Sequence, residues 1–365
     1  MKNLKIIICL VLFFFISIIS IYSSSFILSS EYKYLYLKQL LWYLIGFIII
    51  FILHKKKKDF FYKYDKITYF IGIFLLILVL LIGTNTNGSK AWFYIPQIGS
   101  FQPSEFMKIF LIITLAKELD KYKKLKRTFK NELLIITRCF LITLLPSVLT
   151  FLEPDTGNVI IYFVILIVML FVYGIRYRWF IISILLLSTS ISLFLYLYFY
   201  KSDLFINIFG TNFFYRMDRI LEWKNKEGMQ LENALAATGS AYIYGFGFTK
   251  TPIYIPEAQT DFIVSIYFSN FGYIPSIFLL LLLLFFDISI ISISRKQNIR
   301  DKYLYAGIIS ILLFQQIQNI GMNLGLLPIT GITLPFISYG GSSLISYLIL
   351  IGLIFNTNKK LLNVV

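Results

Sequence analysis

The sequence predicts an all-α polytopic membrane protein with about ten transmembrane helices and a long extracytoplasmic loop between helices seven and eight. Hydrophobic residues make up 58% of the 365 residues and charged residues only 14%, whereas charged residues form about a quarter of an average soluble domain. The mean hydropathy is +0.78. Apolar runs recur at about the 20-residue length that crosses a bilayer. No internal repeat or soluble domain is visible, so we treat 1–365 as one domain.

The distribution of charge argues against a nucleic-acid-binding protein, and the small number of Cys and His residues argues against a disulfide framework or a metal site built from them. A net charge of +16 would fit a nucleic-acid-binding protein only if the cations gathered on one solvated domain, but here they form short clusters between apolar runs. Cys9 and Cys139 lie in apolar or membrane-edge sequence and cannot build a disulfide framework. His54 is the only histidine, which excludes a histidine-based metal site.

The first apolar run, 6–22, follows Lys2 and Lys5 and precedes three serines. A signal peptide looks similar, but its apolar core has about 7 to 15 residues. This run is longer, so we expect a retained first helix. The other spans are expected at 37–53, 67–83, 103–119, 133–152, 158–175, 179–200, 262–289, 303–324 and 341–356.

An even number of spans places both termini on one side of the membrane. If that side is the cytoplasm, 23 of the 34 Lys and Arg residues fall in inside segments and 9 in outside segments. Cytoplasmic loops carry the excess of cations in membrane proteins. We therefore expect cytoplasmic termini and an extracytoplasmic loop at 201–261, whose aromatic and apolar content favours order over disorder.

Asp261 is the first candidate for chemistry. It lies with Glu257 in the segment 256–262, directly before the eighth apolar run and on the extracytoplasmic side. Acidic residues at a membrane segment are costly and therefore indicate a functional role by default.

Glu105 and Lys108 lie in the segment 101–108, on the same predicted side. Residues three apart share one face of a helix, so the two side chains can pair. The pair either neutralises itself so that a helix can begin inside the membrane, or forms a charged wall of a polar cavity.

Glu153 and Asp155 fall in the segment 153–158 between the fifth and sixth spans. Pro, Asp and Gly are turn formers, so a plain turn explains this segment. Alternatively, the two carboxylates join Asp261 around a cation or a polar substrate.

Arg216 and Arg219, early in the long loop, are spaced to share one helical face. Paired guanidinium groups suit a pyrophosphate, although two exposed arginines often bind nothing specific.

The segment 326–343 interrupts apolar sequence with prolines, glycines and hydroxyl groups, among them Ser338 and Ser342. Irregular backbone at membrane depth occurs where it lines a cavity or is buried in protein. The residues together predict an outward-facing cavity for an amphiphile with a phosphate head group. They do not separate a transferase from a transporter.

Five of these stretches resemble, in order, the motifs of the RodA/FtsW/SpoVE (SEDS) family. They are NGSKAW at 87–92, FQPSEF at 101–106, EPDTG at 153–157, PEAQTDF at 256–262 and GLLPITGITLPFISYGGSS at 325–343. The resemblance covers essentially the whole chain. It implies a bacterial cytoplasmic-membrane glycosyltransferase that polymerises lipid II into peptidoglycan glycan strands at the outer face of that membrane, for cell elongation or division.

By motif position, the resemblance makes Asp261 the general base that takes the proton of the acceptor sugar's 4-hydroxyl. Glu105, Lys108, Asp155, Arg216, Arg219, Glu257, Ser338 and Ser342 are assigned to substrate binding. Positive charge for the pyrophosphate leaving group would come from Lys108, Arg216, Arg219 or a divalent cation such as Mg²⁺ or Mn²⁺. No cofactor beyond that is expected.

The chain departs from the family pattern at two positions. Gln259 stands where the family usually has His, two residues before the acid, and Ala91 stands where Arg or Ser is common. The first departure argues against an obligatory imidazole beside Asp261.

The resemblance further implies a class B penicillin-binding protein as transpeptidase partner, within elongasome or divisome assemblies, and leaves elongation-type RodA and division-type FtsW both open. Two other functions compete with polymerisation. A lipid II flippase is disfavoured. Alternating access requires a site near the midplane and often uses inverted repeats, and the sequence shows neither, because its polar segments lie on the outer side. A non-catalytic scaffold for the transpeptidase is the third hypothesis.

Overall fold

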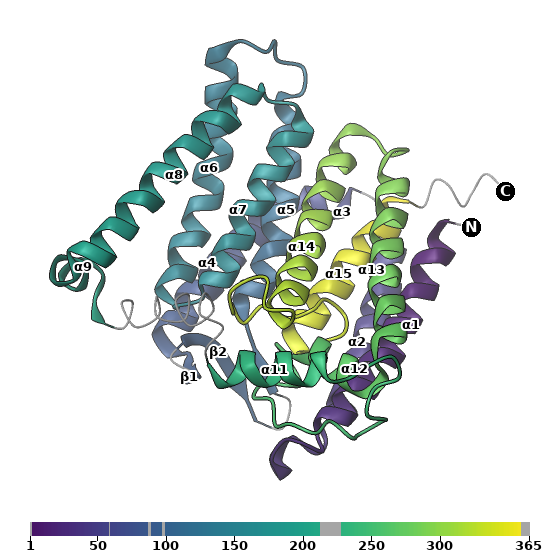
Figure 1. The fold of residues 1–365 in the computed structure, drawn as a ribbon. Coiled ribbons are helices and arrows are strands. Elements are labelled where there is room, and N and C mark those ends of the chain that lie inside the picture. Colours follow the sequence, from purple (N-terminus) through teal and green to yellow (C-terminus); the bar gives the residue numbers. More distant parts are fainter. Residues whose placement is uncertain (1, 58, 87–88, 97–98, 212–227, 359–365) are drawn as a thin grey trace.

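A computed structural model describes residues 2–57, 59–86, 89–96, 99–211 and 228–358. Within them, ten long helices lie where the sequence predicts spans (Figure 1). Their bounds are α1 Lys2–Ser24, α2 Leu35–Lys55, α4 Asp65–Ile82, α5 Pro103–Tyr122, α6 Phe129–Leu152, α7 Thr156–Tyr173, α8 Tyr177–Tyr200, α13 Tyr273–Ser294, α14 Ile299–Asn323 and α15 Gly341–Thr357. All but α5 and α15 are long and apolar enough to cross a membrane by themselves. The prediction of an all-α polytopic membrane protein is confirmed.

Short elements connect the long helices. They are η1 Ser30–Tyr32, α3 Phe60–Lys63, α9 Ser202–Phe209, α11 Met229–Gly239, α12 Ile263–Phe271, and the strands β1 Thr84–Thr86, β2 Ser89–Ile95 and β3 Gly99–Phe101. The strands form an antiparallel sheet in the order β1-β2-β3. We call the end of the bundle that holds this sheet, α11 and α12 the loop end (Figure 1).

Both ends of the described chain lie at the opposite, terminal end of the bundle. There the Asn358 side-chain amide donates a 2.6 Å hydrogen bond to the Asn3 side-chain oxygen. This contact agrees with the even number of spans that the sequence predicts.

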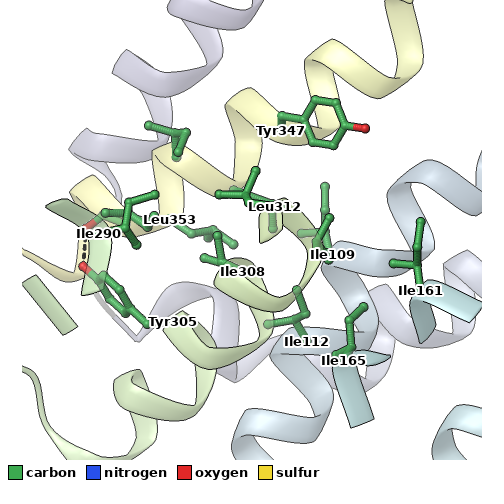
Figure 2. Packing of buried hydrophobic residues seen from close by; sticks show 14 of the residues in the cluster. Ile109, Ile112, Ile161, Ile165, Ile290, Tyr305, Ile308, Leu312, Tyr347 and Leu353 are labelled. Atoms are coloured by element: carbon green, nitrogen blue, oxygen red, sulfur yellow. Dashed lines mark hydrogen bonds between the residues drawn. The ribbon is translucent and has the colours of Figure 1, made fainter. Parts of the chain in front are cut away.

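The core is organised around α14, which packs against α5, α7, α13 and α15. Figure 2 shows Ile308 and Leu312 of α14 among Ile109 and Ile112 of α5 and Leu353 of α15. By contrast, Tyr198 is the one buried residue of α8, which leans away from the bundle (Figure 1). Most apolar side chains of α8 are therefore exposed on the surface of the bundle, while those of α14 are covered by protein.

The predicted eighth span, 262–289, is wrong as a single helix, because it divides into α12 and α13 at Gly272. This glycine has φ +77°, and a Cβ atom there would lie 2.3 Å from the Ile243 carbonyl oxygen. The main chain near Gly245 crosses the break, where the Phe246 amide donates to Ser269 O at 2.8 Å and the Tyr273 amide to Tyr242 O at 3.0 Å. The long loop is therefore anchored on α12, and its described part contains the helices α9 and α11.

Candidate functional site

The segment 256–262, which we call the acidic loop, lies at the loop end directly before α12. Two of its consecutive main-chain carbonyls are held by the segment 325–340. Gln259 O accepts from the Tyr339 amide at 2.9 Å, and Thr260 O accepts from the Ser338 hydroxyl at 2.6 Å. The two segments, about 80 positions apart in sequence, are thus joined through main-chain oxygens.

The next carbonyl, that of Asp261, is held by α14. The side-chain amides of Asn319 and Asn323 each donate to Asp261 O at 2.9 Å. Neither asparagine was predicted as a site residue. The only signal was a run of amides in an otherwise apolar helix, Gln315, Gln316, Gln318, Asn319 and Asn323.

Asp261 is partly exposed as a residue. The pKa of its carboxyl is raised from 3.8 to about 7, mainly by burial and secondarily by the negative charge of Glu257, while the Thr260 side chain opposes both. A Cβ atom at Gly331 would lie 3.6 Å from Asp261 Oδ2, so the segment 325–340 passes beside the carboxyl. A carboxyl with this pKa is partly ionised at neutral pH and can take up a proton.

Gln259, the residue in place of the family's usual His, contacts Glu257. Its Nε2 atom donates to Glu257 Oε2 at 3.1 Å, and the Thr260 hydroxyl donates to the same oxygen at 3.1 Å. Glu257 itself has φ +52°, a conformation that costs a non-glycine residue free energy. Gln259 therefore orients the second carboxylate of the acidic loop.

Asp155, predicted to join Asp261, lies in a different hydrogen-bonding environment. Its Oδ2 atom accepts from Gln102 Nε2 at 2.8 Å, Ser104 Oγ at 3.1 Å and Asn158 Nδ2 at 2.8 Å. Its Oδ1 atom accepts from the Asn158 amide at 3.2 Å and caps α7. Burial raises the pKa of Asp155, and the hydrogen bonds from Asn158 lower it. The carboxylate thus ties the start of α5 to the start of α7.

Glu105 and Lys108 form the predicted pair, with Lys108 Nζ 2.7 Å from Glu105 Oε2 and only 1% of the Lys108 side chain exposed. Ser346 of α15 donates to Glu105 at 3.2 Å, and Lys108 Nζ lies 5.6 Å from the centre of the Tyr347 ring. The pair therefore lies inside the bundle, between α5 and α15.

Both predicted serines use their hydroxyl groups within the protein. Ser338 donates to Thr260 O and accepts from the Leu334 amide at 2.9 Å. Ser342 accepts from the Gln102 amide at 3.0 Å and donates to Ser100 O at 3.2 Å. Substrate binding by these serines stays a prediction, and their observed role is to connect segments.

Glu153, which the sequence placed either in a plain turn or with Asp155 and Asp261 around a cation or a polar substrate, is a buried carboxyl. Its exposed fraction is 0%, and within the described part of the chain neither carboxyl oxygen has a hydrogen-bond partner. Burial, and secondarily the charge of Asp155, raises its pKa from 4.5 to about 9. Glu153 is therefore a neutral acid at physiological pH.

The segment 330–332 lies between the two acidic regions. Gly331 faces Asp261, while a Cβ atom at Gly157 in the first turn of α7 would lie 3.3 Å from Ile332 Cγ1. Gly157, two residues after Asp155, and Asp261 thus lie beside the same segment. Arg216 and Arg219 lie outside the described residues. The described residues contain no group of three His, Cys, Asp or Glu side chains that could hold a metal ion.

Comparison with known proteins adds an independent line of evidence. A family model described as FTSW_RODA_SPOVE, cell cycle protein, matches residues 3–362. The probable peptidoglycan glycosyltransferase FtsW of Wigglesworthia glossinidia brevipalpis is 33% identical over 352 residues, which cover 92% of this chain and 86% of that protein. Stage V sporulation protein E of Bacillus subtilis (strain 168) is 32% identical over 388 residues, 98% of this chain and 97% of that one.

Solved structures support the fold. One chain of a peptidoglycan synthase complex, described for its coordination of polymerization and crosslinking, superposes with a TM-score of 0.79 at 22% identity, covering 97% of both chains. The rod shape determining protein RodA of Thermus thermophilus superposes with a TM-score of 0.70 at 23% identity, covering 97% of this chain and 96% of that one. The bundle and its loop-end elements are therefore an arrangement that solved structures contain.

Proposed function

Because this chain belongs to the FtsW/RodA/SpoVE family, we propose that it is a peptidoglycan glycosyltransferase that polymerises lipid II at the outer face of the bacterial cytoplasmic membrane. The observation that carries this proposal is Asp261, whose main-chain carbonyl accepts two hydrogen bonds from α14, while the residue is partly exposed and its pKa is about 7. The names of the FtsW relatives support the reaction class.

In the proposed reaction, Asp261 accepts the proton of the acceptor sugar's 4-hydroxyl. The oxygen then forms a bond to the anomeric carbon of the donor, and the bond from that carbon to the pyrophosphate oxygen breaks. Undecaprenyl pyrophosphate leaves with the electron pair, and the proton stays on Asp261 until solvent removes it. Such general-base catalysis contributes about 100- to 10,000-fold to a rate, most effectively when the pKa of the base is near the working pH.

Charge on the departing pyrophosphate needs cationic stabilisation. We propose Arg216 and Arg219 for this role, since Lys108 is buried against Glu105. A divalent cation bound to the pyrophosphate is the other source of positive charge that the sequence left open, and no step is assigned to it. Glu257, which is oriented by Gln259 and partly exposed, is proposed to contact the sugar substrate.

We further propose that the loop end faces outward and both termini face the cytoplasm, as the distribution of cations predicts. The loop end would then meet lipid II after it has crossed the membrane. A class B penicillin-binding protein is proposed as partner, with the similar chain in a synthase complex as support. Division or elongation machinery would recruit the pair.

The test is polymerisation of lipid II by the purified protein with its penicillin-binding partner. We expect Asp261→Asn to lower the rate about 100- to 10,000-fold, because the amide cannot act as a base. Asp203→Asn, which changes an exposed acid of α9, is the matched control and should keep the wild-type rate. Glycan chains made by Asp261→Asn at the control rate would refute the assignment of Asp261.

A further inference from the structure

Two asparagines of α14 converge on one main-chain oxygen of the acidic loop. Asn319 and Asn323 are one helical turn apart, 0% and 1% exposed, and both donate to Asp261 O at 2.9 Å. Burying a side-chain amide costs free energy unless its polar atoms are hydrogen-bonded. Hydrogen bonds to the acidic loop, which carries the proposed base, compensate for the burial of these two amides.

The same two side chains hold the segments on either side of the base. Asn323 Oδ1 accepts from the Ser265 amide at 3.0 Å and the Ser265 hydroxyl at 2.8 Å, which fixes the first turn of α12. Asn319 Nδ2 also donates to Ile332 O at 2.8 Å, which fixes the segment beside the Asp261 carboxyl. Acidic loop, α12 and the segment 330–332 are therefore joined at one point of α14.

Helix α14 is well suited to carry such a clamp. It is the most buried of the candidate spans, with 72% of its apolar window inside the protein. Side chains on a packed helix are placed more reproducibly than side chains on a loop. An acid held through its main chain by such a helix keeps its carboxylate available for substrate.

We propose that Asn319 and Asn323 are positioning residues for Asp261, which set the place of its carboxylate by clamping its main-chain carbonyl to α14. This inference rests on the proposed function of Asp261 as general base. The asparagines do not touch the reacting atoms. Their effect arises because a displacement of about 1 Å at a reacting group can cost about 100-fold in rate.

A purely structural role is the competing explanation, and the chain offers a matched control for it. Asn356 in α15 is also 0% exposed and donates to two main-chain carbonyls, Leu53 O at 2.7 Å and Lys56 O at 2.8 Å. It lies at the terminal end, far from the acidic loop. Its loss removes two donations to main-chain carbonyls, as the loss of Asn319 does, without touching Asp261.

The experiment compares Asn319→Leu, Asn323→Leu and Asn356→Leu in the full-length protein with its penicillin-binding partner. All three should lower the thermal unfolding temperature. Only the α14 variants should lower kcat for lipid II polymerisation, about 10- to 100-fold by the positioning argument, with KM within about twofold. Their activity should also begin to rise at a lower pH, because water that reaches a loosened carboxyl removes the burial that raises its pKa.

Equal kcat per folded molecule for Asn319→Leu and Asn356→Leu, with an unmoved pH profile, would overturn the inference. If Asn319→Leu yields no folded protein, Asn319→Ala removes the same donor without added bulk or charge and serves instead. Hydrogen exchange at the amides of 259–262 gives a readout without activity, and it should be faster in the α14 variants alone.

Asp261→Asn separates the two proposals. An inactive Asp261→Asn together with a fully active Asn319→Leu leaves the base in place and refutes the positioning role. An active Asp261→Asn refutes the base, and with it the reason for the clamp.

Discussion

Asp261 and Asp155 are two aspartates that the sequence places in similar settings, each beside a proline-containing turn at one end of the bundle, yet the protein holds them in opposite ways. Asp261 is fixed through its main-chain carbonyl, which accepts from Asn319 and Asn323. Among the described residues, the neighbouring Thr260 is the one side chain whose hydrogen bond lowers the pKa of its carboxyl. Asp155 is fixed through its carboxylate, which accepts four hydrogen bonds from three residues.

The difference separates an acid that is available for catalysis from an acid that stabilises the fold. A carboxylate whose lone pairs are occupied by protein donors has little capacity to take a proton or bind a sugar. A carboxylate whose residue is fixed through the main-chain carbonyl keeps that capacity. The same residue type therefore supports α5 and α7 at one site and provides a candidate base at the other.

The largest expected difference between the two aspartates is in the stability of their variants. Asp155→Asn places an amide NH₂ group against donors from Gln102, Ser104 and Asn158, and leaving such buried groups unpaired costs about 1–3 kcal/mol. We expect a lower unfolding temperature for Asp155→Asn and an unchanged one for Asp261→Asn, measured in the same detergent. If Asp155→Asn instead raises KM for lipid II at full stability, Asp155 binds substrate, as the sequence predicted.

Glu153 is a third case, because within the described residues its carboxyl is neither hydrogen-bonded nor exposed. Its pKa of about 9 lies above the usual 4.5, so the folded protein keeps a proton that the unfolded chain releases above about pH 4.5. Stability is then fully present at low pH and is lost as pH rises towards 9, by up to about 1.4 kcal/mol per pH unit. Thermal unfolding across pH 6 to 8.5 should show this slope, and Glu153→Gln should flatten it. An equal slope in the variant would contradict the buried neutral acid.

Glu257 offers the smallest and most specific test. Its charge is the second cause of the raised pKa of Asp261, after burial. Glu257→Gln should therefore lower that pKa and move the rise of the pH–rate profile to lower pH, whatever the loss of sugar contact does to the maximal rate. Because burial persists, the rise should stay above the usual pKa of 3.8. Glu232→Gln, in exposed sequence of α11, is the control, and an equal shift there would point to a general charge effect.

Much of the fold was predictable because a membrane demands long apolar helices whatever their partners. Helical spacing likewise predicted the pairing of Glu105 with Lys108. The break at Gly272 was not predictable, since it depends on the crossing of a distant main-chain segment, and the small sheet at 84–101 was missed as well. Asn319 and Asn323 were not predicted as site residues, because their side-chain NH₂ groups donate to main-chain oxygens, which leave no pattern in the sequence.

The anchoring of the acidic loop through main-chain oxygens also bears on how such a protein can change over evolutionary time. Every amino acid carries the same carbonyl, so mutation at 259 or 260 exchanges a side chain while the bonds from Tyr339 and Ser338 remain. A lineage can therefore replace a histidine by Gln259 without displacing the acid two positions later. Selection on the chemistry of position 259 is thereby separated from selection on the place of Asp261.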